Sequence, residues 1–427
     1  MNDAAKSPSL SATHRAWVLY DWANSGFATV MLTAVFPVYF IAQVPATGLT
    51  LPGLPPLPAS ALWGYMVSGS MLLVAVLAPW LGAIADFGGH RNRFLTILGT
   101  LGALATLTLG LSPWSLLPLA LLFLLANLGF AGGNLFYNAL LPQITTTGNL
   151  DRLSSRGYAI GYIGGGLVLL AGFVLIQWHG SFGLADKGAA SRLLIVLTGL
   201  WWLLFALPCF YRVKDRTQDR SGQRTAYGQT FRELARHRNA LRFLLAFLCY
   251  NDGIQTLITI SSVFAVDELG LGQSTILGCF LMIQFVAMPG TYLCQQLAER
   301  IGTRKTLLAT LLLFTLITAY AWTMHSSWQF WLLGVLVALV LGGSQALSRS
   351  LFARLIPPEK SAEFFGFFAI SNKFASILGP LTFALFAHLT GSTRNAVLSL
   401  TLFFIVGGLL LLGVAVPAAD GDDHQHG

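Results

Sequence analysis

Long apolar stretches alternate with short polar segments along the whole chain. A membrane-spanning helix needs about 20 predominantly apolar residues, and twelve stretches satisfy this requirement. The expected spans are residues 17–43, 60–85, 93–111, 115–141, 158–178, 191–211, 241–266, 274–298, 305–323, 328–352, 364–389 and 395–415. The pattern therefore predicts an all-α membrane protein with twelve transmembrane helices.

Basic residues are unevenly shared between the two sets of connecting segments. If the N-terminus is cytoplasmic, the segments on that side hold most Lys and Arg residues, and the opposite side holds only Lys187, Arg192 and Arg394. Segments rich in Lys and Arg remain in the cytoplasm. We therefore expect both termini to be cytoplasmic and the protein to lie in a bacterial cytoplasmic (inner) membrane.

The longest polar segment separates the sixth span from the seventh and carries a cluster of basic residues. We interpret it as a linker near anionic headgroups, with a short surface helix in "TFRELARHR". The expected organisation is an N-terminal segment, a six-helix half, the linker, a second six-helix half and a tail. Their bounds are 1–16, 17–211, 212–240, 241–415 and 416–427.

Composition supports a membrane protein and excludes several other classes. Charged residues make up 10% of the chain, against about 25% in soluble domains. The four cysteines lie in apolar stretches without metal-ligand spacing, so we expect no metal site. The formal charge of +8 is concentrated in loops, so we expect no nucleic-acid partner. Neither a GxxxxGK[ST] motif nor a GxSxG or HExxH motif is present. We expect no enzyme activity and no cofactor.

Several segments of the first half recur in the second. "GAIADFGGHRNR" after span two corresponds to "QQLAERIGTRK" after span eight, and "YDWANSGFATV" corresponds to "YNDGIQTLITI". This alignment pairs Asp86 with Glu299, Gly89 with Gly302 and Arg91 with Arg304. Two repeated halves are typical of secondary transporters, whose substrate site lies between the halves near the middle of the membrane.

The loop "GAIADFGGHRNRF" matches the motif G-x-[LI]-A-D-x-x-G-x-[RK]-x-[RK] of the major facilitator superfamily. "YDWANSGFATV", "YNALLP", "SSRGYAIGYIGGG", "YNDGIQT" and "GGSQALSRS" further resemble the vacuole-effluxer-like family. The resemblance implies that helices 1, 4, 7 and 10 line a cavity and that helices 2, 5, 8 and 11 form the interface between the halves. It also implies efflux of amino acids, as in the fungal member.

The loop residues are candidates for gating. The resemblance implies that this loop fastens helix two to helix eleven on the cytoplasmic side when the cavity is open outward. Glycine permits a tight turn, and an aspartate is favoured at the N-terminus of a neighbouring helix. The gating candidates are Gly82, Asp86, Gly89, Arg91 and Arg93.

Three charged residues interrupt apolar spans: Asp21, Asp252 and Lys373. A charge at the centre of a spanning helix costs about 2.5–3.5 kcal/mol on insertion scales, so it usually has a partner inside the bundle. We expect Lys373 to pair with Asp252, or with Asp21 across the cavity. Asp21 is alternatively a carboxylate at a helix start. Arg349 either contacts an anionic group or extends to the headgroups.

Polar side chains on the expected cavity helices are candidates for contacting a polar substrate. Amides also hold membrane helices together, and that alternative stays open. Tyr158 and Tyr162 either line the path or pack, and Gly157, Gly161 and Gly165 permit close helix contact. The substrate candidates are Asn24, Asn127, Asn134, Asn138, Asn251, Gln255, Gln284 and Gln345, together with the three charged residues.

These features predict a secondary transporter that moves a small polar solute by alternating access, with a monomeric chain in the lipid bilayer. An amino acid is the candidate solute, and proton coupling through Asp252 or Asp21 is a hypothesis. The alternatives are a facilitated uniporter and a non-transporting membrane receptor or scaffold built on a transporter fold.

Overall fold

The computed structural model describes residues 11–45, 49, 59–215, 232, 234–375, 378–390 and 392–416. Within the predicted surface helix "TFRELARHR", residues 232 and 234–238 are described, and residues 232 and 234–236 are helical. The ends of the chain lie outside the described residues. The first half contains α1 (Ala12–Phe27), a π-helical segment (Ala28–Ala34), α2 (Phe36–Gln43), α3 (Ala59–Gly88), α4 (Arg91–Leu111), α5 (Leu116–Ile144), α6 (Leu150–Gln177) and α7 (Lys187–Arg212).

The second half contains α9 (Arg238–Asp267), α10 (Gln273–Ile301), α11 (Thr303–Trp322), α12 (Ser327–Leu355), α13 (Ser361–Phe374), α14 (Leu378–Thr390), α15 (Thr393–Ser399) and α16 (Thr401–Leu412). Ten of the described helices are long and apolar enough to span a membrane. The first predicted span is a bent pair of helices, and the eleventh is divided into α13 and α14. Every predicted span thus corresponds to a helix or to a broken helix.

A proline follows each of the two breaks. Pro37 lies in the first turn of α2, where its missing N–H is tolerated, and the axis bends by 44° there. Pro380 lies in the first turn of α14. Proline in a helix interior removes a backbone hydrogen bond and clashes with the preceding turn, whereas a helix start accommodates it. Helix eleven is therefore two half-helices, a feature that the apolar pattern did not predict.

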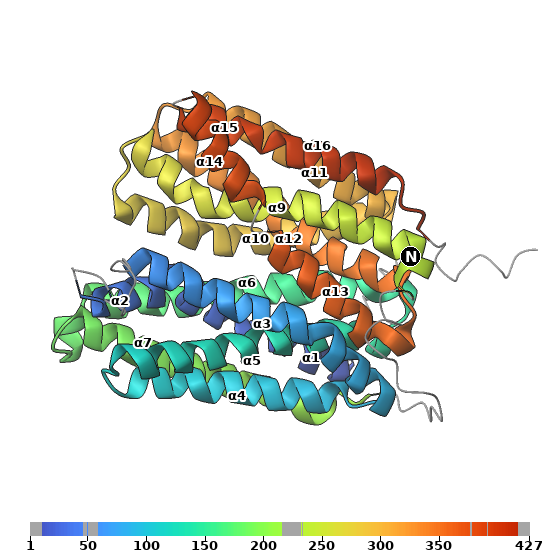
Figure 1. Ribbon diagram of the computed structural model, residues 1–427, viewed down its shortest axis with the longest axis horizontal. Coiled ribbons are helices and arrows are strands. Elements are labelled where there is room, and N and C mark those ends of the chain that lie inside the picture. The colour runs from blue at the N-terminus through green and yellow to red at the C-terminus, as the bar shows by residue number, and fades with distance from the viewer. Residues whose placement is uncertain are drawn as a thin grey trace, which may run out of the picture.

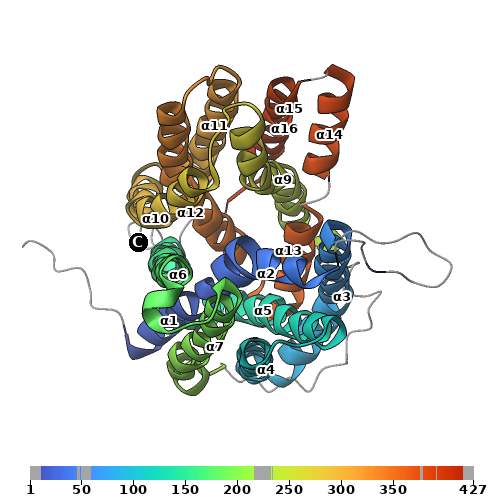
Figure 2. The ribbon, with the colours of Figure 1, turned by 90° about the vertical axis from the view of Figure 1, so that its left-hand side faces the viewer.

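The two halves lie one above the other, with α1–α7 below and α9–α16 above (Figure 1). Viewed from the end, α6 and α13 lie where the two groups of helices meet (Figure 2). α6 packs on α10 and α12, and α13 packs on α3 and α5. The contacts of α6 with α10 and of α3 with α13 confirm the expected interface of helices 2, 5, 8 and 11.

One end of the bundle carries the turns at residues 88–91, 145–149 and 356–360, and we call it the basic end. The start of α1 belongs to this end, because the His14 ring is hydrogen-bonded to the carbonyl oxygen of Ile144 at 2.9 Å. The end of α16 lies beside the start of α11, since Arg304 donates to the carbonyl oxygen of Val414 at 2.6 Å. The repeated loops have the same backbone form, with positive φ at Gly89 (59°) and Gly302 (93°).

Candidate functional site

The Arg349 side chain leaves α12 of the second half and ends inside the first half. It is 1% exposed. Its Nη1 lies 3.3 Å from Oδ2 of Asp21 on α1 and donates to Oδ1 of Asn138 on α5 at 3.2 Å. Its Nε and Nη2 donate to the hydroxyl and carbonyl oxygens of Ser154 on α6, at 2.9 and 2.8 Å. One guanidinium group therefore joins α12 to three helices of the other half.

Three aromatic rings of the first half surround the same guanidinium group. Its Cζ lies 4.9 Å from the ring centroid of Trp17, 5.4 Å from that of Tyr137 and 4.3 Å from that of Tyr158. Desolvated cation–π contacts of this kind contribute about 2 kcal/mol or more. The Tyr137 hydroxyl also donates to Oδ2 of Asp21 at 2.8 Å. We call the set the Arg349 cluster, comprising Arg349, Asp21, Trp17, Tyr137, Asn138, Ser154 and Tyr158.

A glycine of α6 makes room for this cluster. A Cβ atom at Gly157 would lie 2.6 Å from Oδ2 of Asp21 and 3.0 Å from Nη2 of Arg349. Real Cβ atoms essentially never approach other heavy atoms to below 3.0 Å. The "SSRGYAIGYIGGG" segment therefore permits helix packing, as expected, and also accommodates a buried ion pair.

These contacts decide between the alternatives that the sequence left open for Arg349 and for Asp21. Arg349 does not extend to the headgroups, because its charge is buried between the halves. Asp21 is not a carboxylate at a helix start, because α1 begins at Ala12 rather than at residue 17. The ion-pair partner of Asp21 in this conformation is Arg349. The side chain of Lys373 lies outside the described residues, so its expected pairing stays a prediction.

The loop after α3 joins the halves a second time. Oδ1 and Oδ2 of Asp86 accept the backbone N–H groups of Ala362 and Glu363 at 3.1 and 2.8 Å, at the N-terminus of α13. Arg91 donates to Oδ1 of Asp86 at 2.6 Å and to the carbonyl oxygen of Glu359. A carboxylate at a helix N-terminus is stabilised by the helix dipole. This contact joins helix two to helix eleven, as the resemblance implied.

The other gating candidates, Gly82, Gly89 and Arg93, form no hydrogen bond to α13 among the described residues. Gly82 lies so close to the backbone of Ala362 that a Cβ atom there would overlap it. Gly89 forms the turn with its positive φ, and Arg93 is exposed. Asp215, after α7, accepts the N–H of Asn92 at 2.9 Å. Burial of Asp215 raises the pKa of its carboxyl group. No local pattern in the sequence marks Asp215 as a contact residue.

Replacing Asp86 with asparagine is expected to slow the transport cycle with less effect on substrate affinity. The change removes the negative charge from the N-terminus of α13, where it is worth about 0.3–2 kcal/mol, and weakens only the closed basic end. Solute exchange by proteoliposomes measures the cycle, and thermal stabilisation by substrate measures affinity. Glu299→Gln is the matched control, because its 3.5 Å pair with Arg152 is partly exposed and weak. Equally large losses of affinity and exchange would contradict this role.

Asp151, at the start of α6, forms a third contact between the halves. It accepts hydrogen bonds from Arg354 and from Thr303, each at 2.6 Å, and from the Ser350 hydroxyl. The sequence analysis did not identify Asp151, because a carboxylate outside the apolar spans carries no local signal. The start of helix five is therefore held by the second half, as the start of helix eleven is held by the first half.

The amides of α5 are each bound to a different helix. Asn127 donates to Oγ of Ser70 on α3 at 2.7 Å, and Asn134 accepts from Asn24 on α1 at 2.6 Å. Asn138 belongs to the Arg349 cluster. The structure therefore does not bring these amides together in one site. In this conformation they connect helices, which is the alternative that the sequence left open.

Two of the candidate amides of the second half have hydrogen-bond partners, one within that half and one in the first half. Asn251 on α9 donates to Oδ1 of Asn372 on α13 at 2.7 Å. Gln345 on α12 accepts from the Tyr162 hydroxyl of α6 at 2.7 Å, which joins the halves near the middle of the bundle. The remaining two candidates, Gln255 on α9 and Gln284 on α10, are half-buried.

Asp252 lies deep in α9 and faces the start of α14. It is 1% exposed, and its Oδ2 accepts the backbone N–H of Gly379 at 2.8 Å. Its Oδ1 has no hydrogen-bond partner among the described residues. The carboxylate is thus stabilised by a half-helix N-terminus, and no described cation pairs with it.

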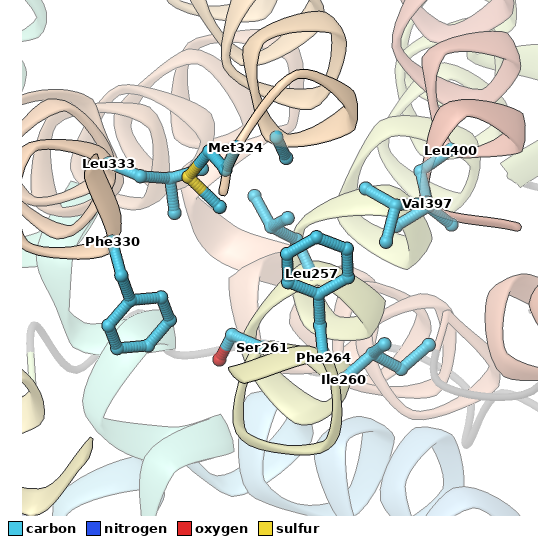
Figure 3. A pocket seen from close by; sticks show the side chains of 10 residues that line it. Leu257, Ile260, Ser261, Phe264, Met324, Phe330, Leu333, Val397 and Leu400 are labelled. Atoms are coloured by element: carbon cyan, nitrogen blue, oxygen red, sulfur yellow. The ribbon is translucent and has the colours of Figure 1, made fainter. Parts of the chain in front are cut away.

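A pocket between α9, α11, α12 and α15 has an almost entirely apolar wall (Figure 3). Leu257, Phe264, Met324 and Phe330 contribute to it, and Ser261 is its polar lining residue. Its volume of about 20 Å³ is enough for roughly one water molecule. It is too small for a solute and contains none of the candidate residues.

Comparison with known proteins identifies the family. Residues 58–424 match the family described as vacuole effluxer Atg22 like. The chain belongs to this family. Its members are transporters rather than enzymes. The chain is 36% identical to an uncharacterized MFS-type transporter YxiO of Bacillus subtilis, over 93% of each chain. It is 28% identical to autophagy-related protein 22 of Kluyveromyces lactis, over 84% of this chain and 81% of that protein.

Solved structures confirm the fold of this chain. A bacterial homologue of the iron transporter ferroportin, in an outward-facing state, aligns with a TM-score of 0.69 at 16% identity, covering 94% of this chain and 99% of that one. The transporter FucP in an outward conformation aligns with a TM-score of 0.70 at 13% identity, covering 95% and 100%. The chain therefore has the all-α major facilitator fold.

Proposed function

We propose that this protein is a gradient-driven transporter that moves a small polar solute, with an amino acid as the candidate, by alternating access. The observation that carries the proposal is the sealing of one end of two repeated halves by buried polar contacts. The Arg349 cluster and the Asp86 contact both cross from one half to the other. Contacts of this kind are suited to breaking and re-forming as a unit when the halves rock.

The proposed orientation places the basic end in the cytoplasm of a bacterial cell, with both termini on that side. The unequal distribution of Lys and Arg supports it, as does the Bacillus relative. The conformation described above is then closed to the cytoplasm and corresponds to an outward-facing state. The similar solved structures named as outward-facing agree with this assignment.

An amino acid is supported by the family rather than by a complete binding site. The family description names an effluxer. Asn134, Gln255 and Gln345 lie on helices 4, 7 and 10, and amides of this kind can bind the polar groups of an amino acid after the halves rearrange. A proton gradient is the proposed energy source. A uniporter would need no titratable group in the transport path, so the buried Asp252 carboxylate favours coupling.

Uptake into proteoliposomes tests the proposal. Vesicles containing the purified protein are offered labelled amino acids, sugars and nucleosides, with and without an imposed pH gradient. We expect saturable uptake of at least one amino acid, increased by the gradient. Uptake that does not depend on the pH gradient would indicate a uniporter. Ligand binding in a thermal-shift screen without any uptake would indicate a receptor or scaffold and would contradict the proposal.

A further inference from the structure

We propose that Asp252, Thr256 and the start of α14 form a proton-binding site, and that protonation of Asp252 loosens the outer half of helix eleven. The inference rests on the proposed function for its role in transport, although proton binding itself does not depend on any solute. It assigns the coupling role to Asp252 rather than to Asp21.

Two buried oxygen atoms without partners lie at this position. Oδ1 of Asp252 and Oγ1 of Thr256 both lack a hydrogen bond within the described part of the chain, and Thr256 is 0% exposed. Four residues separate them, so they lie on one face of α9. A Cβ atom at Gly379 would overlap Oγ1 of Thr256 and would lie 2.9 Å from Oδ1 of Asp252. Gly379 therefore leaves both oxygen atoms a shared space beside α14.

A proton is the ligand that this space fits. A buried polar atom without a partner is costly. A proton on Oδ1 neutralises the buried charge and so lowers that cost, and rotation of the two side chains would let the resulting hydroxyl donate to the Thr256 oxygen one turn along α9. Hard metal cations require about six or more oxygen ligands, and the described residues supply one carboxylate oxygen and one hydroxyl oxygen. The groups present thus suit a proton better than a metal ion.

The surroundings explain why Asp252 rather than Asp21 takes the proton. Asp21 is held by the guanidinium of Arg349 and by the Tyr137 hydroxyl. The groups that face the Asp252 carboxylate are the Cys249 thiol on α9 and the backbone N–H groups of Leu378 and Gly379 on α14. The Arg394–Glu268 pair is at the far end of α9, and Lys373 on α13 is the nearest basic residue in sequence. Asp252 has no described counter-ion.

The site links protonation to helix eleven, because α13 and α14, the two parts of helix eleven, are each capped by a carboxylate from another helix. Asp86 of α3 caps α13, and Asp252 of α9 caps α14. Both interactions depend on negative charge at a helix N-terminus. Protonation of Asp252 removes that charge and weakens the attachment of α14 to α9, while the Asp86 cap on α13 is unchanged. Proton binding at Asp252 is therefore converted into movement at the start of α14.

Infrared spectroscopy of the reconstituted protein tests the site without any solute. We expect a titrating carboxylic-acid C=O band of a buried acid that is present in the wild type and missing in Asp252→Asn. Other buried carboxyl groups, among them Asp86 and Asp215, contribute bands common to both proteins, so the two titrations are compared by their difference. The control Asp186→Asn changes an exposed helix cap and should give the wild-type titration. Identical titrating bands in the wild type and in Asp252→Asn, the absence of a titrating band in the wild type, or a carboxylate signal that responds to Na⁺ rather than to pH would overturn the proposal.

Transport measurements then test the coupling. In Asp252→Asn, accumulation driven by a pH gradient should fall by a larger factor than solute exchange at equal pH. Thr256→Val should shift the titration of the band, because the hydroxyl acceptor is gone. Thr318→Val should not, because the Thr318 hydroxyl is bonded within α11. Gradient-driven accumulation by Asp252→Asn would overturn the coupling. If the wild type transports no solute, the proposed function fails while the infrared result still decides the site.

Discussion

Replacing Arg349 with alanine is expected to lower the free energy of unfolding by about 3–5 kcal/mol and to abolish transport. Removing one member of a buried ion pair leaves the other charge uncompensated, and this accounts for a loss of that size. The buried Asp21 carboxylate would keep the Tyr137 hydroxyl as a donor but would lose its guanidinium partner. The free energy is measured by denaturant unfolding in detergent, and transport is measured by solute exchange in proteoliposomes.

Two further variants separate the ion pair from a general loss of packing. The double variant Asp21→Asn with Arg349→Met removes both charges and should recover part of the lost stability, because no buried charge is left unpaired. Arg394→Ala breaks a partly exposed pair within the second half and should cost about 1 kcal/mol or less. Equal destabilisation by Arg349→Ala and by the double variant would show that the charge pair is not the source of the effect.

Replacing Gly82 with valine is expected to open the basic end. The valine Cβ would overlap the backbone of Ala362, and this overlap exists only while α3 and α13 are in contact. Overpacking of this kind costs about 1–3 kcal/mol. Because this cost applies only to the conformation with a closed basic end, it raises the ratio of open to closed molecules by about 5- to 150-fold.

Labelling of a buried cysteine measures this shift. Ala139→Cys is introduced into a variant without the four native cysteines, because Ala139 is fully buried in α5 beneath the Ser361 hydroxyl. Gly82→Val should increase its rate of reaction with a water-soluble maleimide. Gly148→Val is the matched control, since a Cβ atom there meets no neighbouring atom. An unchanged labelling rate in Gly82→Val would mean that the Gly82 contact does not set the conformation.

The spans, the halves and the family were predictable because their signals are local. An apolar stretch of spanning length reports a helix wherever it packs, and the loop motif around Asp86 is contained within one short segment. The interface between helix two and helix eleven was also anticipated, but not from a local signal. Only the resemblance supplied it, since nothing local indicates which helix receives the Asp86 carboxylate.

The partners of the buried charges could not be predicted in the same way. Asp21 and Arg349 are 328 residues apart, and Asp252 and Gly379 are 127 apart. Their contacts depend on how whole helices pack. The amides of α5 show this limit, because their spacing does not reveal that each faces a different helix. One local signal was present and unused, namely the Gly379-Pro380 pair, which marks a break.

The position of Arg349 has a consequence for how the basic end opens. Its charge belongs to the second half, whereas its counter-ion, hydrogen-bond acceptors and aromatic contacts belong to the first. A small separation would remove these partners before water could replace them, so intermediate positions are the least stable. Closing and opening should therefore behave as a two-state switch rather than as a gradual widening, in keeping with the bistability of packed interfaces.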